Sequence, residues 1–299
     1  MPPDHIIPDI WFPNLGIYFE RIPQILFSPF GFDIYWYAIF IVAGIAAAYF
    51  LAVWYAKRTR QKVDDYTDLL MLGVVMAVIG LRTYYLVFNW DLYRGQPFFR
   101  TIFNLRGGGL AIYGGIIGAL LAGVVMSMVK KIPFTTFADT CAPSLLLGQV
   151  IGRFGNFFNR EAFGGYTDNL FAMRIRLDQV HGSIPYDLRQ TAITVQGIQY
   201  LQVHPTFLYE AFFNLLLMIF IIIYRPHKRF EGECILLYLL GYGVIRFFVE
   251  GLRTDQLMFF DTGWPASQLV SIVFAVFSLA AIVVGHVNAK RSGNSRKIR

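Results

Sequence analysis

The sequence predicts an all-α polytopic membrane protein with about seven transmembrane helices and a small extracytoplasmic head. Three observations support this fold class. Hydrophobic residues make up 56% of the 299 residues and charged residues only 15%, whereas soluble domains carry about 25% charged residues. Several apolar stretches have the roughly 20 residues that a helix needs to cross a bilayer. Clusters of lysine and arginine separate these stretches in a regular order. A soluble domain and a disordered chain are therefore excluded.

Six of the apolar stretches are clear candidates for spans. They cover residues 38–55, 69–88, 109–129, 207–224, 234–249 and 266–287. A seventh stretch, 133–152, is less apolar and contains Asp139. We include it because its length fits a bilayer crossing.

The basic clusters predict the orientation. They follow the first, third, fifth and last spans, and cytoplasmic loops carry the excess of lysine and arginine. We therefore expect the amino terminus outside and the carboxyl terminus in the cytoplasm. The net charge of +7 is then explained without nucleic acid as a partner. The expected order is an interfacial arm, four spans, an extracytoplasmic head, three spans and a basic tail, at 1–35, 36–152, 153–206, 207–288 and 289–299.

The long connection at 153–206 contains two stretches in which apolar and polar residues alternate. They read FAMRIRL and TAITVQGIQYLQV. Alternation with a period of two is typical of short strands. We expect strands there, with Gly197 in a hairpin turn.

Arginines inside the spans indicate a functional site. A charge at the centre of a span costs about 2.5 to 3.5 kcal/mol, yet Arg82, Arg153 and Arg246 lie in or at the ends of the second, fourth and sixth spans. These spans run in the same direction, so we expect the three guanidinium groups at one depth. Arginine stays protonated and binds phosphate through two N–H groups. The pattern favours recognition of a phospholipid phosphate. The alternative is that each arginine only extends to the interface beside an acid.

The sixth span carries a polar face. Tyr242, Arg246, Glu250 and Arg253 follow at i, i+4, i+8 and i+11, which places them on one side of a helix. We expect Glu250 and Arg253 to form a structural ion network. Glu250 would orient the arginines and leave Arg246 free to contact a ligand.

The densest group of polar residues lies where the fourth span meets the head. The segment GRFGNFFNREAFGG contains Gly152, Arg153, Gly155, Asn156, Asn159, Glu161 and Gly164. Capping of a helix end would explain one asparagine and one glycine, but not the whole set. His204, at the entrance of the fifth span, is either a structural hydrogen-bonding residue or a base.

Four segments together resemble the family of bacterial phosphatidylglycerol-prolipoprotein diacylglyceryl transferases. They are GRFGNFFNREAFGG, AIYGGIIGA from Ala111, HPTFLYE from His204 and GYGVIRFFVEGLR from Gly241. The segments YWYA and GLRTYYLVF are similar to further parts of the family's sequence. The resemblance extends over nearly the whole chain.

The resemblance implies an enzyme of the bacterial plasma membrane that acts at the outer leaflet. Such an enzyme moves the diacylglyceryl group of phosphatidylglycerol to the lipobox cysteine thiol of a preprolipoprotein and releases glycerol phosphate. The resemblance implies that Arg153 and Arg246 are essential and that Glu161 belongs to the family signature. Their places in the sequence add Tyr113 and His204 to the residues that we expect in catalysis. We expect phosphatidylglycerol to be bound by seven residues. The resemblance implies Arg153, Arg246, Tyr37, Asn156 and Gly164, and the positions of Arg82 and Tyr242 in their spans add these two.

One position departs from the family pattern. Many members have histidine before the Gly-Gly pair of the third span, where this sequence has Tyr113. We expect Tyr113 to position a thiol or a phosphate oxygen, at a place where Gly114 and Gly115 let the backbone approach substrate. The base then remains open between Glu161, His204 and the lipid phosphate.

No metal or cofactor is expected, because the five histidines lack metal-binding spacing. The rival class is a transporter or translocator of an anionic lipid, since arginines within spans also mark anion sites. Against it, the charges gather at one face of the membrane.

Overall fold

The structure is a computed structural model that describes residues 7–93, 108–259, 262–291 and 293. It consists of two compact units. The first contains residues 1–48 and 142–299, and the second contains residues 49–141.

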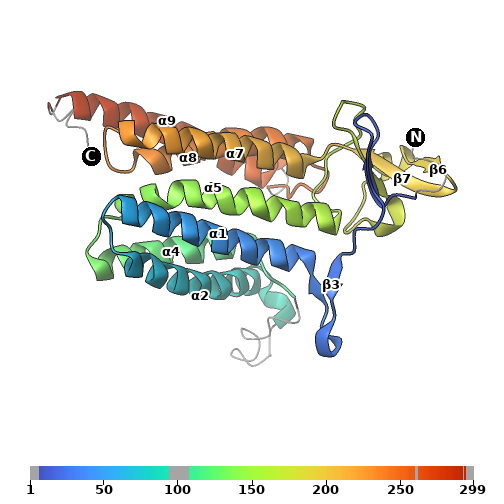
Figure 1. Ribbon diagram of the computed structural model, residues 1–299, viewed down its shortest axis with the longest axis horizontal. Helices are drawn as coiled ribbons and strands as arrows, with labels where there is room; N and C mark the ends of the chain where they lie inside the picture. The colour runs from blue at the N-terminus through green and yellow to red at the C-terminus, as the bar shows by residue number, and fades with distance from the viewer. Residues whose placement is uncertain (1–6, 94–107, 260–261, 292, 294–299) are drawn as a thin grey trace. The chain divides into compact units, whose positions relative to one another are not determined.

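The predicted all-α polytopic fold is confirmed. Every predicted span corresponds to one long helix of the described chain (Figure 1): α1 (Trp36–Arg58), α2 (Val63–Phe88), α4 (Ile112–Lys130), α5 (Phe134–Asn159), α7 (Thr206–Tyr224), α8 (Glu233–Leu252) and α9 (Ala266–Arg291). Six of these helices are long and apolar enough to cross a membrane. The exception is α5, whose 26 residues include polar side chains such as Asp139 and Gln149. The chain is thus a multi-pass membrane protein with six clear span candidates.

The head contains a five-stranded antiparallel sheet with the strand order β2-β1-β5-β7-β6. The strands are β1 (Ile10–Phe12), β2 (Ile17–Phe19), β5 (Met173–Arg176), β6 (Ile193–Val195) and β7 (Ile198–Val203). The two stretches predicted as strands are therefore confirmed. The hairpin between β6 and β7 turns at Gln196 and Gly197, whose φ angles are 52° and 79°. Two positive φ angles are typical of the tight type I′ turn.

Strands from the amino-terminal arm belong to the same sheet as the head. In β1, Ile10 pairs with Ile175 of β5, and β2 continues the sheet at its edge. From the sequence, residues 1–35 are expected as an arm apart from the head at 153–206, whereas strands of both segments share this sheet. Strands of three residues are too short for an alternating pattern to be recognised. A second hairpin, β3 (Ile25–Phe27) with β4 (Ile34–Tyr35), leads into α1.

The core of the head continues into the ends of two helices. Ile10, Ile175 and Leu201 of the sheet are buried against Phe157 of α5 and Phe207 of α7. A short helix, α6 (Tyr186–Gln190), adds Leu188 to this core. Burial of these side chains fixes where α5 ends and where α7 begins, and the candidate site lies at that point.

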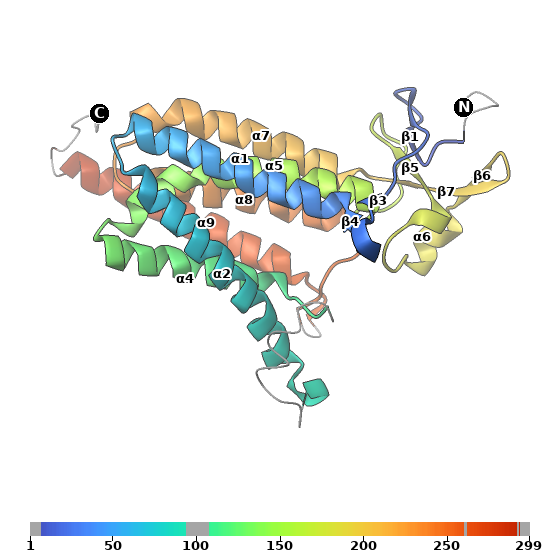
Figure 2. The ribbon, with the colours of Figure 1, turned by 60° about the horizontal axis from the view of Figure 1, so that its bottom comes forward.

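Helices α5, α7 and α8 of the first unit pack side by side (Figure 2). Their shared core contains Leu146 of α5, Ile221 of α7 and Tyr238 of α8. Helix α7 has 19 residues and is therefore about 28 Å long. The head lies at its beginning, and the basic loop with Arg225 and Arg229 follows its end.

The second unit depends on close contact between α2 and α4. A Cβ atom on Gly114 would lie 2.1 Å from the carbonyl oxygen of Gly80, and one on Gly118 would lie 2.1 Å from the carbonyl oxygen of Met76. Small residues of this kind let two helix backbones approach. The expectation that Gly114 makes room for substrate is therefore wrong, because the backbone of α2 occupies that space.

Candidate active site

The centre of the site is a buried carboxylate that joins two arginines. Glu210, in the first turns of α7, has only 1% of its surface exposed. Its Oε1 lies 2.6 Å from Nη2 of Arg153 on α5, and its Oε2 lies 3.0 Å from Nη1 of Arg246 on α8. The structure thus brings together Arg153 and Arg246, from helices that are far apart in the sequence.

A second carboxylate extends this network along α8. Nη2 of Arg246 lies 2.6 Å from Oε2 of Glu250, and Nε of Arg253 lies 3.9 Å from the same oxygen. The prediction that these residues share one face of the helix is confirmed. Arg246 is not left free, however, because it contacts both Glu210 and Glu250.

Arg253 is also held from its other side. Its Nε and Nη2 donate to the two carboxylate oxygens of Asp255 at 2.9 and 2.7 Å. Burial raises the pKa of Asp255, but the hydrogen bonds and the charge of Arg253, together with a backbone hydrogen bond and the charge of Arg246, outweigh burial and lower it. Asp255 is therefore ionised at neutral pH, and the pair with Arg253 is stable there.

The junction between α5 and the head is tied to Arg153. Nη1 of Arg153 lies 3.5 Å from Oδ1 of Asn156, and Nδ2 of Asn156 donates to Oε1 of Glu161 at 3.0 Å. Asn159 donates to the same carboxylate oxygen at 3.4 Å. The polar set predicted at this junction therefore forms one connected network.

Two tyrosines flank Arg153. Tyr37 of α1 packs on Gly155, where a Cβ atom would lie 2.8 Å from its ring. It lies within electrostatic range of both Arg153 and Glu161. Tyr242 of α8 lies beside Arg153 and Glu210 and stacks on Tyr238 with 5.7 Å between the ring centroids. Both predicted tyrosines are thus close to the arginine network.

His204 and Gly164 lie where the head meets α7 and α8. Nδ1 of His204 is 3.3 Å from the hydroxyl oxygen of Tyr209. Burial lowers the pKa of His204, so its ring is neutral at pH 7. The backbone N–H of Gly164 donates to the carbonyl oxygen of His204 at 3.0 Å, and a Cβ atom on Gly164 would lie 2.8 Å from the carbonyl oxygen of Leu252. Gly164 therefore has a packing role, and its contact with lipid stays a prediction.

Arg82 and Tyr113 belong to the second unit. Arg82 is 2% exposed, and its Nη1 donates to the carbonyl oxygens of Gly108 and Gly109 at 2.7 and 3.0 Å. The ring of Tyr113 lies 6.3 Å from that of Tyr84. The predicted convergence of Arg82 with the arginines of the first unit stays a prediction, as does the role of Tyr113.

The cost of charge in a span marks Glu210, like the arginines, as a functional candidate, but the sequence assigns it no role in the site. An acid in an apolar span is as costly as an arginine, but this cost does not indicate which residues pair with it. Its two partners come from α5 and α8, so no spacing within one helix reveals the pairing. Among the described residues, no group of three His, Cys, Asp or Glu side chains is placed to hold a metal ion.

One known protein family matches most of this chain. The family described as prolipoprotein diacylglyceryl transferase matches residues 24–284. Proteins named phosphatidylglycerol–prolipoprotein diacylglyceryl transferase are similar over most of their length. The one from Finegoldia magna is 38% identical over 254 residues, which cover 85% of this chain and 92% of that protein. The one from Clostridioides difficile is 36% identical over 271 residues, covering 91% and 98%. The one from Enterococcus faecalis is 40% identical over 270 residues, covering 90% and 92%. This chain therefore belongs to the prolipoprotein diacylglyceryl transferase family.

Proposed function

We propose that this protein transfers the diacylglyceryl group of phosphatidylglycerol to the lipobox cysteine thiol of a preprolipoprotein. The observation that carries the proposal is the pair of arginines, Arg153 and Arg246, held on one buried carboxylate. Family membership supports the chemistry and disfavours the alternative of a lipid translocator. The reaction takes place at the outer leaflet of the bacterial plasma membrane, with the head outside.

The arginine pair binds the phosphate of the lipid. Each guanidinium has five N–H donors, and the contacts of Arg153 and Arg246 to carboxylates and Asn156 use only some of them. The remaining donors can bind the phosphate oxygens without displacing Glu210. Glu210 fixes the spacing between the two guanidinium groups, so the phosphate meets a preorganised site.

The reaction breaks a carbon–oxygen bond of the lipid. The cysteine thiolate attacks the glycerol carbon that carries the phosphate, a carbon–sulfur bond forms, and the bonding electrons leave with the phosphate oxygen. Charge accumulates on the departing glycerol phosphate, and the arginines stabilise it. The thiol has a pKa near 8.5, so a base must remove its proton. Glu161, neutral His204 and the lipid phosphate are the candidates, and Tyr113 positions the thiol or a phosphate oxygen.

The sidedness rests on the distribution of charge. In the first unit, the basic loop after α7 and the basic end of α9 contain Arg225, Arg229, Lys290 and Arg291. Cytoplasmic loops are enriched in such residues. The head adjoins the opposite end of α7 and therefore faces outward.

The test uses purified protein in lipid nanodiscs with labelled phosphatidylglycerol and a lipobox peptide. We expect a peptide that carries diacylglyceryl in thioether linkage, together with free glycerol phosphate. A matched peptide with serine in place of cysteine should give no adduct. If folded protein in nanodiscs that contain phosphatidylglycerol forms no thioether adduct, the proposal is refuted.

A further inference from the structure

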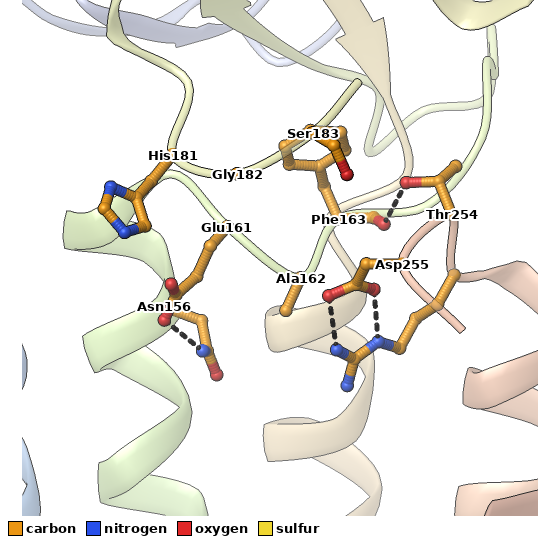
Figure 3. Close-up of a pocket in the computed structure, with 10 residues that line it drawn as sticks. Asn156, Glu161, Ala162, Phe163, His181, Gly182, Ser183, Thr254 and Asp255 are labelled. Carbon is orange, nitrogen blue, oxygen red and sulfur yellow. Dashed lines mark hydrogen bonds and ion pairs between the residues drawn. The ribbon is translucent and has the colours of Figure 1, made fainter. Parts of the chain in front are cut away.

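A cavity of about 290 Å³ lies inside the first unit, next to the arginine network. Figure 3 shows the residues that line it. Its walls come from Asn156 at the end of α5, from the segments 161–163 and 253–255, and from the loop 181–183. The cavity is at the small end of the range for small-molecule sites. It is too small for a stretch of polypeptide.

Several polar groups on the wall have hydrogen-bonding capacity that the described residues do not use. Oε1 of Glu161 accepts from Asn156 and Asn159, whereas Oε2 makes no hydrogen bond. The hydroxyl of Ser183 and the ring of His181 also make none with the described residues, although both side chains line the cavity. The wall therefore offers acceptors and donors together, which is what a hydroxylated ligand needs.

The backbone around Glu161 has an uncommon conformation that its surroundings maintain. Arg160 and Ala162 have φ angles of 54° and 57°, in a region that side chains other than glycine rarely adopt. Nη2 of Arg160 lies 3.3 Å from Oδ2 of Asp9, and the hydroxyl of Thr206 donates to the carbonyl oxygen of Ala162. These contacts hold the segment so that Glu161 lies on the cavity wall. Backbone strain of this kind is concentrated at functional sites.

The cavity is one side chain away from the arginine pair. Asn156 links Arg153 to Glu161. On the other side, Glu250 links Arg246 to Arg253, whose pair with Asp255 is part of the wall. In phosphatidylglycerol, the head-group hydroxyls are on the second and third carbons beyond the phosphate. A phosphate on the arginine pair would place these hydroxyls at the cavity.

We propose that this cavity binds the glycerol head group of phosphatidylglycerol and selects for its two hydroxyls, a proposal that rests on the function proposed above. The hydroxyls donate to Oε2 of Glu161 and exchange hydrogen bonds with Ser183. An ethanolamine head group fits less well, since its ammonium group can only donate and would lie near the cationic Arg253. A head group without hydroxyls would forgo these hydrogen bonds and so bind more weakly.

The test compares two donor lipids that differ only in the hydroxyls. Purified full-length protein in nanodiscs transfers to a lipobox peptide from phosphatidylglycerol or from phosphatidylpropanol, whose head group has the same three carbons. We expect the wild type to prefer phosphatidylglycerol at least tenfold in kcat/KM. Ser183 lies on an exposed loop, so Ser183→Ala should leave the fold intact. This variant should reduce the preference about threefold or more, because it slows the reaction of phosphatidylglycerol and not that of phosphatidylpropanol. Glu161→Gln should reduce it further.

The control variant is Asp178→Asn, because Asp178 is an exposed acid paired with Arg176 and does not line the cavity. It should keep the wild-type preference. Equal wild-type rates with the two lipids would refute the proposal, and so would an unchanged preference in Ser183→Ala. If Ser183→Ala raises only the KM for the peptide, the cavity belongs to the protein substrate and the proposal is also refuted. Failure of the proposed function is distinct, since no adduct would then form from phosphatidylglycerol.

Discussion

Glu210 provides the sharpest test of the site, because one carboxylate holds both arginines. Glu210→Ala removes an anion that is 1% exposed and leaves Arg153 and Arg246 buried without it. Breaking a buried ion pair by removal of one partner costs about 3 to 5 kcal/mol. Glu210→Gln keeps one oxygen acceptor and loses one hydrogen bond to a charged group, worth about 1.5 to 3 kcal/mol. Both variants should therefore unfold at lower temperature than the wild type, alanine more than glutamine.

The same substitutions should lower activity beyond their effect on stability. Without the carboxylate, the two guanidinium groups lose their fixed spacing, and a misplacement of about 1 Å costs on the order of a hundredfold in rate. Glu210→Asp keeps the charge but is one methylene shorter, so it can hold one arginine and not both. We expect its transfer rate to lie between those of the wild type and Glu210→Gln.

The assay combines thermal unfolding in detergent with diacylglyceryl transfer to a lipobox peptide at saturating and limiting lipid. Glu231→Gln is the matched control. Oε2 of Glu231 lies 2.8 Å from Nζ of Lys228, and its side chain is 39% exposed. An exposed ion pair contributes at most about 1 kcal/mol, so this variant should behave almost as the wild type. If Glu210→Gln unfolds and reacts as the wild type does, the carboxylate neither stabilises nor positions the arginines.

Three further predictions follow from the fold and the site. Arg153→Lys and Arg246→Lys keep the charge but lose the planar fork, so each should lower turnover severely in protein that still folds and inserts; near-normal adduct formation by both would contradict the assignment. If the hydroxyl of Tyr113 positions a substrate atom, Tyr113→Phe should cost about 1 to 3 kcal/mol in transition-state stabilisation, measured from kcat/KM. Tyr113→His should retain activity. Full activity of Tyr113→Phe would remove Tyr113 from the site. Gly114→Ala should destabilise the protein by about 1 to 3 kcal/mol through overpacking, because its Cβ would lie 2.1 Å from a backbone oxygen. Gly73→Ala is the control, because a Cβ on Gly73 meets nothing within 4 Å. It should leave the thermal midpoint unchanged or raise it.

The helical part of the fold could be predicted because length and hydropathy act locally. An apolar stretch of about 20 residues has to be a helix in a bilayer, whatever its neighbours are. The head was harder to predict. The stretches around 171–177 and 191–203 alternate clearly enough to indicate strands, but β1 has only the three residues Ile10–Phe12. Its place in the sheet depends on pairing with β5, a partner more than 150 residues away.

The same distinction between local and long-range contacts applies to the site. The shared face of Arg246, Glu250 and Arg253 could be predicted, because one helix fixes their relative positions. The cost of charge in a membrane identified Arg153 without any partner. The pairing of Glu210 could not be predicted, because its partners are on two other helices. Its role follows only from the packing of α5, α7 and α8 around a common core.

The balance of charge in the network explains why the geometry of arginine matters more than its charge. Arg153, Arg246 and Arg253 are offset by Glu210, Glu250 and Asp255, and Glu161 adds one more acid nearby. A phosphate that approaches therefore meets little net positive charge. On the proposed function, the phosphate has to be bound by short hydrogen bonds from N–H donors that the carboxylates leave unused. A guanidinium can donate to a carboxylate and a phosphate at once in one plane, whereas an ammonium is a compact point charge that one carboxylate can already neutralise. The predicted failure of lysine at Arg153 and Arg246 follows from this difference.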